Sequence, residues 1–519
     1  MAGKLLPRVR QARCAIAGFG CNQAFLFTML YLGSVGAGEQ YGFFAARADL
    51  LCVLLAMTAT FACMIRSGVR GRLMGVAEGL ARVFAVPLVA ALLLLVGLQY
   101  VLPQVPWVVF AVLEGLVGGV ALGLLLCLWG RRLGEASIDQ SVPEVFIGSA
   151  LGAAVCFFVI AIPVEGAYLV LYLLPLGSAA ALRALGAAGH NEVRDAGAVL
   201  DGPDSGSTTG GNGEARVNVP HDFAASSSSV SAESDEAQKL SGRIVAGTAV
   251  YGVATGAVEA MASSASISGA TSLSVTFALF VLYCVAALQL YGGRPLSAGV
   301  RAVLPTGPDT EVGPLGGAYR LALLLMVGGF VAVPLLESVG VSGVAVVLAG
   351  YLGIFSVLIS LFLIMGRMTG RDTVRSFARG FTALFMGEIV GVLVGGLLAA
   401  LPGSFDTGAA LVALAGVAVL YAYLFLFTDR DMAALSVVVA QTDRFEEACA
   451  TIAKQAKLSK REAEILPMAL RGRTAERIAS EFFISKNTVD THLRRIYAKC
   501  GVHTRQELID LGERTEKEL

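Results

Sequence analysis

The chain has 519 residues, of which 56% are hydrophobic and only 15% are charged, and its mean hydropathy is +0.72. This composition excludes an ordinary soluble globular protein and is typical of a chain that crosses a membrane many times. The formal net charge is zero, so a nucleic-acid-binding part has to be recognised from local rather than total charge.

Twelve apolar segments approach the length of about 20 residues that a membrane-spanning helix needs. They lie at 14–34, 46–65, 76–99, 105–129, 145–163, 165–185, 243–262, 270–291, 320–338, 342–365, 379–401 and 408–427. The first follows a basic stretch, and its length favours a span over a cleaved signal peptide. The sequence therefore predicts an all-α polytopic membrane protein with two six-helix halves, at 1–185 and 243–427, embedded in the lipid bilayer.

Residues 186–242, between the two halves, have a different composition. They are polar, rich in Gly and Ser, and poor in large apolar side chains. Such a segment cannot bury enough apolar surface to offset the conformational entropy of folding. We interpret it as a disordered cytoplasmic linker.

Arginines alternate between successive loops. Loops after even-numbered segments hold Arg66, Arg70, Arg72, Arg131, Arg132, Arg183, Arg194, Arg294, Arg301, Arg367, Arg371, Arg375 and Arg379. Loops after odd-numbered segments hold almost none, Arg47 being the main exception. Because short cytoplasmic loops are enriched in Lys and Arg, this alternation predicts that both termini lie on the cytoplasmic side of the inner membrane.

Two carboxylates fall well inside predicted spans, Glu114 in the fourth and Glu388 in the eleventh. Charges are unfavourable in the hydrocarbon, so both are candidates for a ligand- or proton-linked role, with interhelical hydrogen bonding or a structural ion pair as the alternative. Glu259 lies toward the outer end of its span, where reaching to water is the simpler explanation. Glu78 and Arg82, four residues apart, are expected to pair with each other.

The composition changes after residue 427. Residues 428–457 are mixed polar and helical in pattern, and we interpret them as a connector. Candidate N-cap residues then precede four short helices, at Ser459, Thr474, Ser485 and Thr504. Ser459 and Thr504 are each followed by Glu three residues later, as in a capping box, and Gly472 suits a left-handed helix end. These features predict a four-helix domain at 458–519.

The third of these helices, residues 486–500, is polar and basic. Its charged residues are Lys486, Asp490, Arg494, Arg495 and Lys499, and an apolar stripe of Val489, Leu493 and Ile496 faces inward. Short helices joined by tight turns, with a basic third helix, are typical of helix-turn-helix domains that enter the major groove of DNA. Basic side chains there contact phosphates, whereas residues near the helix N-terminus reach base edges.

This segment resembles the LuxR/NarL-type (GerE-like) helix-turn-helix family over about 55 residues. The matching residues are Arg461, Glu462, Glu464, Gly472, Ile478, Ala479, Ser485, Thr488, Val489, His492, Ile496, Tyr497, Lys499, Gly501, Val502, Arg505 and Leu508. The resemblance implies that Lys486, Thr488, Thr491 and Arg494 contact double-stranded promoter DNA. It implies phosphate contacts by Arg495 and Lys499, and a homodimer on inverted half-sites that the fourth helix supports.

Asp490 departs from this pattern, because the family often has Lys directly after Thr-Val. A carboxylate in this place can accept a hydrogen bond from cytosine N4 but repels phosphate. We therefore include Asp490 among the DNA-facing residues, but the base preference of the family does not carry over at this position.

The order of six spans, linker and six spans resembles the layout of the major facilitator superfamily. The loop at 66–72 is similar to the basic loop of that superfamily between spans two and three, but it lacks the acidic residue. An ordinary cytoplasmic loop rich in Arg explains it equally well.

Together these features predict a membrane-embedded one-component transcriptional regulator. Its membrane part senses a small-molecule ligand or a membrane state, and its C-terminal domain binds promoter DNA. The alternative is a major-facilitator-like transporter with a regulatory DNA-binding tail. We find no nucleophile elbow, phosphate loop or Cys/His metal spacing, so no enzyme activity, metal or cofactor is expected.

Overall fold

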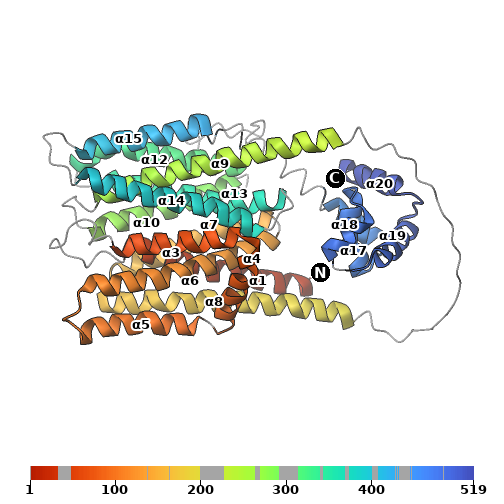
Figure 1. Cartoon of the computed structure of the whole chain (residues 1–519), viewed down its shortest axis with the longest axis horizontal. Helices are drawn as coiled ribbons and strands as arrows, with labels where there is room; N and C mark the ends of the chain where they lie inside the picture. The colour runs from red at the N-terminus through yellow and green to blue at the C-terminus, as the bar shows by residue number, and fades with distance from the viewer. Residues whose placement is uncertain are drawn as a thin grey trace. The chain divides into compact units, whose positions relative to one another are not determined.

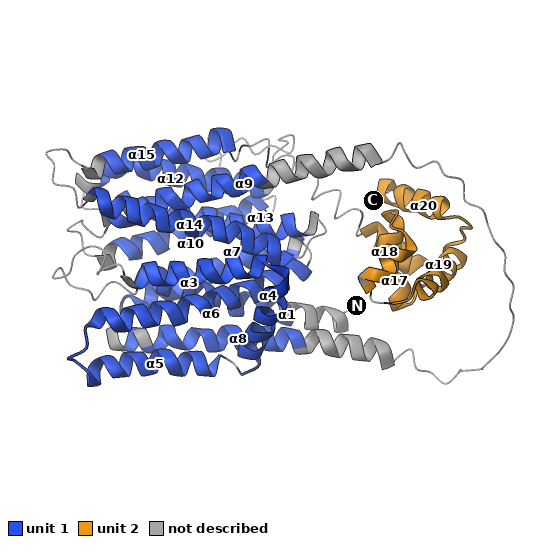
Figure 2. Ribbon diagram, in the orientation of Figure 1, with its two compact units in different colours: residues 1–432 blue, residues 433–519 orange. Residues whose placement is uncertain are grey.

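The computed structural model describes residues 2–32, 48–83, 85–136, 138–162, 164–198, 227–262, 269–291, 314–338, 343–368, 373–399, 407–426, 428, 431, 445, 447–482 and 484–518. All regular structure within these ranges is helical. The chain divides into two compact units, Met1–Met432 and Ala433–Leu519, which Figure 2 colours separately.

The first unit contains long helices, which Figure 1 labels. They are α1 (Ala2–Phe27) with the π-helical turn η1 (Thr28–Leu32), α3 (Ala48–Ile65), α4 (Ser67–Arg82), α5 (Val86–Val101), α6 (Trp107–Glu135), α7 (Ile138–Val159), α8 (Val164–Ala198), α9 (Ser227–Ala262), α10 (Gly269–Tyr291), α12 (Pro314–Ser338), α13 (Gly343–Met368), α14 (Thr373–Ala399) and α15 (Thr407–Tyr421) with η2 (Ala422–Leu426).

Many of these helices satisfy the requirements for crossing a membrane. Among the described residues, eight are long and apolar enough, or up to nine if a bent helix pair forms one span. Two shorter apolar helices lie at Asp49–Ile65 and Ala410–Leu426. The protein is therefore a multi-pass membrane protein, as the composition predicted, and the count of twelve spans stays a prediction.

The predicted third span, 76–99, is wrong as a single straight helix. The chain forms α4 and α5, which meet at an angle of 79°. Ala85 adopts a left-handed conformation with φ of 56°, and Pro follows at the start of α5, so the helix cannot continue. The predicted pairing within α4 is confirmed, because Arg82 lies 3.7 Å from Glu78, which also accepts a hydrogen bond from Arg131 at 2.8 Å.

The two membrane halves repeat one packing pattern. α1 packs on α7 as α9 packs on α14, and α3 packs on α6 as α10 packs on α13. α5 packs on α8 as α12 packs on α15, and the contact of α3 with α14 across the halves is matched by that of α10 with α7. Equivalent helices follow the same order in each half, as in transporter folds built from parallel repeats. The membrane unit thus consists of two halves with the same packing pattern, and the six-plus-six layout stays a prediction.

Glycine allows the closest of these contacts. A Cβ atom at Gly252 of α9 would strike the carbonyl oxygen of Leu384, and one at Gly391 of α14 would strike that of Val253. Small residues let helix backbones approach closely where the lipid supplies no hydrophobic driving force between helices. α9 and α14 therefore pack backbone to backbone.

The predicted linker at 186–242 is helical at both ends, which corrects its description as disordered throughout. α8 continues to Ala198, and α9 begins at Ser227. Residues 186–198 contain four alanines, and a helix already started in the apolar segment extends through them without a new nucleation step. Residues 199–226 lie outside the described residues.

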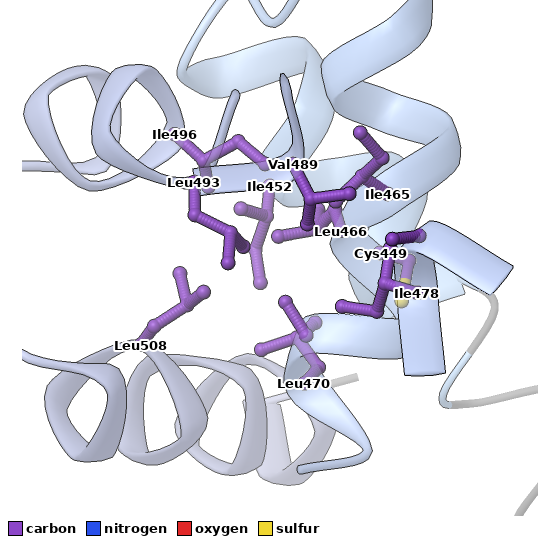
Figure 3. Packing of buried hydrophobic residues seen from close by; sticks show 12 residues of the cluster. Cys449, Ile452, Ile465, Leu466, Leu470, Ile478, Val489, Leu493, Ile496 and Leu508 are labelled. Atoms are coloured by element: carbon purple, nitrogen blue, oxygen red, sulfur yellow. The ribbon is translucent and has the colours of Figure 1, made fainter. Parts of the chain in front are cut away.

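The second unit contains α17 (Lys460–Leu470), α18 (Ala475–Phe482), α19 (Lys486–Cys500) and α20 (Arg505–Glu518), which match the four predicted helices. Residues 447–455 form a further helix. Figure 3 shows its Cys449 and Ile452 among the buried side chains of this unit, beside Ile465, Leu466 and Leu508. The unit thus begins before the predicted boundary at 458, because part of the predicted connector supplies its core.

Candidate nucleic-acid interface

The helix ends of the second unit are capped as the sequence predicts. Ser459 Oγ accepts a hydrogen bond from the Glu462 amide at 3.4 Å, while the Glu462 carboxylate accepts one from the Ser459 amide at 2.7 Å. Ser485 Oγ accepts one from the Thr488 amide at 3.1 Å and so begins α19. Gly501 ends α19 in the left-handed conformation, with φ of 68°. These caps fix the length and direction of α19.

The cap of α20 differs slightly from the predicted box. Thr504 Oγ1 accepts a hydrogen bond from the Glu507 amide at 3.2 Å, as expected. The Glu507 carboxylate reaches one residue further back and accepts from the His503 amide at 2.8 Å. The His503 amide also lowers the pKa of Glu507.

α19 has one buried face and one open face. Val489, Leu493 and Ile496 are buried in the core, as predicted. The exposed side chains are Lys486, Asn487, Thr488, Thr491, Arg494, Arg495 and Lys499, and Asp490 is half-buried. The five other predicted contacts, Lys486, Thr488, Thr491, Arg494 and Arg495, are thus all exposed. Asn487 is exposed beside them in the first turn, and the sequence reading missed it.

Lys486 is tied to the preceding helix. Its Nζ lies 2.5 Å from Glu476 Oε1 of α18, and both side chains are exposed. The hydrogen bond raises the pKa of Lys486 and lowers that of Glu476. Because an exposed ion pair contributes little to stability, a DNA phosphate can replace Glu476 as the partner of Lys486 at small cost.

Lys499 has a different environment from the other basic residues of α19. Its Nζ donates to the Glu462 carboxylate at 2.6 Å and to the Lys457 carbonyl oxygen at 3.4 Å. Glu462 is only 2% exposed, and although burial raises its pKa, the bonds from Lys499 and Ser459 more than offset this and leave the pKa lowered. Lys499 therefore holds the end of α19 against the start of α17, a structural role that sequence reading missed.

Other residues of the family-like pattern also support the fold. The Arg461 guanidinium stacks on the Phe482 ring at 4.7 Å and lies 2.8 Å from Glu464. Arg505 donates to the Arg473 carbonyl oxygen, which joins α20 to the turn before α18. These contacts join α17 and α20 to α18 and its preceding turn, so these residues support the fold. The exposed residues of α19 remain the candidate DNA-facing surface.

The two predicted intramembrane carboxylates occupy separate places. Glu114 on α6 accepts a hydrogen bond from the Tyr172 hydroxyl of α8 at 3.1 Å. Glu388 on α14 is fully buried and accepts one from the Tyr351 hydroxyl of α13 at 2.9 Å. Each carboxylate thus accepts a hydrogen bond from a tyrosine of another helix. Interhelical hydrogen bonding was the alternative to a ligand- or proton-linked role. The expectation that Glu259 reaches to water is wrong, because α9 and its neighbours leave this residue only 2% exposed.

A buried polar cluster surrounds Tyr351. This residue interacts electrostatically with Glu388, with Glu259 of α9 and with Tyr31 of η1. The cluster thus joins three helices of the second half to the first helix of the first half. Among the described residues, no group of His, Cys, Asp or Glu has a metal-binding arrangement.

Comparison with known proteins identifies the C-terminal part. Residues 456–511 match the family model of the bacterial regulatory proteins of the luxR family. The oxygen regulatory protein NreC of Staphylococcus aureus strains JH9 and USA300 is 42% identical over 53 residues, which are 10% of this chain and 24% of the relative. The chain thus spans about a quarter of the length of these curated relatives.

Solved structures resemble most of the chain at low sequence identity. A bacterial homologue of the iron transporter ferroportin in an outward-facing state is 11% identical, with 83% of this chain and 99% of that chain covered and a TM-score of 0.49. The xylose transporter XylE from E. coli is 12% identical, with 80% and 96% covered and a TM-score of 0.43. Residues 456–511 are a luxR-family regulatory domain in the C-terminal part of a multi-pass membrane protein, whose regular structure is helical throughout the described residues.

Proposed function

We propose that this protein is a membrane-embedded one-component transcriptional regulator. Its membrane unit binds a small-molecule effector, and its luxR-family domain binds promoter DNA from the cytoplasmic side of the inner membrane, where both termini lie. The observation that carries the proposal is the open face of α19, with Thr488, Thr491, Arg494 and Arg495 exposed next to an N-terminus capped by Ser485.

The open face of α19 has residues for both kinds of contact that DNA recognition needs, to base edges and to phosphates. Thr488 and Thr491 lie in the first half of α19, where side chains reach base edges in the major groove. Arg494 and Arg495 follow one turn later, where they neutralise phosphates. A homodimer on inverted half-sites doubles these contacts, and α20, which packs on α17 and α19, is its proposed interface.

Regulation requires an effector with different affinities for two states of the membrane unit, since a ligand that binds both equally shifts nothing. The two-half layout, with a polar cluster joining α1 to the second half, supplies two bodies that can change their relative arrangement. The change alters the dimerisation or presentation of the DNA-binding domain.

DNA binding by the segment 433–519, a compact unit with its own core, tests the base of the proposal. Duplexes selected from a random library should bind with an affinity that falls as salt rises. Arg494→Ala should weaken binding and flatten the salt dependence, whereas Lys454→Ala, an exposed control on the helix at 447–455, should change neither. A segment that folds but binds no selected duplex contradicts the proposal.

A transporter with a regulatory tail is the second candidate, favoured by the repeated packing of the two halves and by the buried Glu388. In this case the protein moves a solute across the membrane, and a proton-linked carboxylate contributes. Solute uptake by cells that express the chain without residues 433–519, abolished by Glu388→Gln, would support it.

A further inference from the structure

Three polar side chains of the first membrane half are buried without internal partners. Asn22 and Gln23 of α1 and Ser149 of α7 are each 0% exposed. Both polar atoms of each amide, and the Ser149 hydroxyl, form no hydrogen bond within the described part of the chain. Buried amides and hydroxyls almost always have a partner, so three together require an explanation.

The packing of α1 on α7 brings these groups to the same level. A Cβ atom at Gly20 would lie 3.2 Å from the Gly148 carbonyl oxygen, and one at Gly152 would lie 2.8 Å from Gln23 Cβ. The contacts advance together along both chains, so the helices run parallel and in step here. Measured along the helix axes, the levels of Ser149 and Gln23 therefore differ by no more than about one turn.

Helix geometry also places them on related faces. Met29 of η1, which continues α1, contacts α6, and Phe27 of α1 contacts α10. At 3.6 residues per turn, Asn22 and Gln23 fall between these two directions. On α7, Gly148 faces α1 and Phe146 packs on α10, and Ser149 falls between them. Since α10 belongs to the second half, all three polar groups face the junction of the two halves.

The chemistry of this set defines a ligand class. Two amides and one hydroxyl supply several hydrogen-bond donors and acceptors and no charge. We propose that Asn22, Gln23 and Ser149 recognise a small uncharged ligand that carries both donors and acceptors, such as a polyol or a primary amide. The inference rests on the proposed function only in identifying this ligand with the effector.

A packing role explains the three residues less well. Polar residues join membrane helices when they bond to one another, but these do not bond to any described group. For contact alone, apolar side chains of the same size suit a buried position better, because an unpaired buried polar group is unfavourable.

Cysteine accessibility in the full chain tests the site. With the native cysteines replaced, Asn22→Cys, Gln23→Cys and Ser149→Cys are treated in membrane vesicles with 2-hydroxyethyl methanethiosulfonate, an uncharged reagent, and remaining thiols are counted by a maleimide gel shift. Ala24→Cys and Ala153→Cys are matched controls, since both alanines are 0% exposed on the same two helices. We expect modification several-fold faster at the three site positions than at the controls.

Equal rates at site and control positions, or no modification at all, would overturn the proposal. Ser149→Cys is nearly isosteric, so it keeps the test decisive even if the α1 variants do not fold. Protection is then measured with myo-inositol, D-glucose and nicotinamide, and with acetate and choline as charged controls. Protection by an uncharged compound supports the ligand class; protection by none, or by the charged controls alone, overturns it. DNA binding by the segment 433–519 is measured separately, so the failure of one proposal is distinct from that of the other.

Discussion

Arg243 of α9 binds Asp431, which follows η2 in the chain, with 3.3 Å between Nη1 and Oδ1. Asp431 also accepts hydrogen bonds from the Thr428 amide and hydroxyl at 2.9 and 2.8 Å, and Arg243 donates to the Phe425 carbonyl oxygen at 3.1 Å. Because Asp431 is 5% exposed and nearly the last residue of the membrane unit, these bonds fix the point at which the chain leaves that unit.

We therefore expect Arg243→Gln to uncouple the two units. In the full chain, the variant should reduce the effector-dependent change in reporter expression while DNA binding by the segment 433–519 stays unchanged. The charge reversal Arg243→Asp with Asp431→Arg should restore part of the response. A normal response in the single variant would show that this ion pair has no part in coupling.

A stable DNA-binding fragment should have to include the helix at 447–455, because this helix supplies part of the core. Ile452 is 2% exposed in the core, so Ile452→Ala should destabilise the segment 433–519 by about 2–5 kcal/mol. A fragment that starts at 458 should lose still more stability, since it also lacks Cys449. Thermal unfolding followed by circular dichroism measures both, and equal midpoints for the long and short fragments would contradict the assignment.

Lys499 and Arg495 should behave differently although both are basic residues of α19. Lys499→Ala leaves the buried Glu462 carboxylate without its cation, and loss of one partner from a buried pair costs about 3–5 kcal/mol at most. Arg495→Ala, at an exposed position, should leave stability unchanged. Because it removes one phosphate contact, it should lower both the affinity for DNA and the salt dependence of that affinity. Denaturant unfolding and binding titrations on the same proteins separate the two effects.

The lowered pKa of Glu462 predicts acid sensitivity of the segment 433–519. The folded pKa lies below the ordinary 4.5, so the stabilisation is fully present above pH 4.5 and is lost as pH falls through the folded value. Glu462→Gln should be less stable at neutral pH and should lose less stability on acidification. A parallel decrease in both proteins would contradict this linkage.

Asp490 should limit affinity for DNA. It is half-buried on α19 and interacts with Lys486, so its charge lies near the proposed phosphate-binding residues. Asp490→Asn should strengthen binding to unselected DNA, because a repulsive charge is removed. Library selection with both proteins checks base preference: a reduced preference for cytosine in the variant is expected if the carboxylate accepts from N4.

The sequence predicted local features better than long-range ones. Capping residues, the apolar stripe of α19 and the pairing of Glu78 with Arg82 depend on neighbours within one turn, and the structure confirms each. The bend at Ala85 was missed because a left-handed alanine has no sequence pattern of its own.

Roles that depend on tertiary contacts could not be predicted. Lys499 has the composition of a phosphate-binding residue, and only the position of α17 shows its carboxylate partner. Glu259 lies near a helix end, and only the packing of the neighbouring helices shows that it is buried. The partner of Glu388, Tyr351, likewise lies on another helix and could not be predicted from the sequence.

Since the helix after Phe445 belongs to the DNA-binding unit, the chain between Asp431 and Phe445 has about 14 residues and can extend over roughly 50 Å at most. This length limits how far from the membrane the DNA-binding unit can reach. A DNA target site therefore has to come within this reach of the membrane before the DNA-binding unit can bind it. Moving the same operator to a chromosomal position far from the envelope should therefore reduce regulation, even though the protein and the DNA sequence are unchanged.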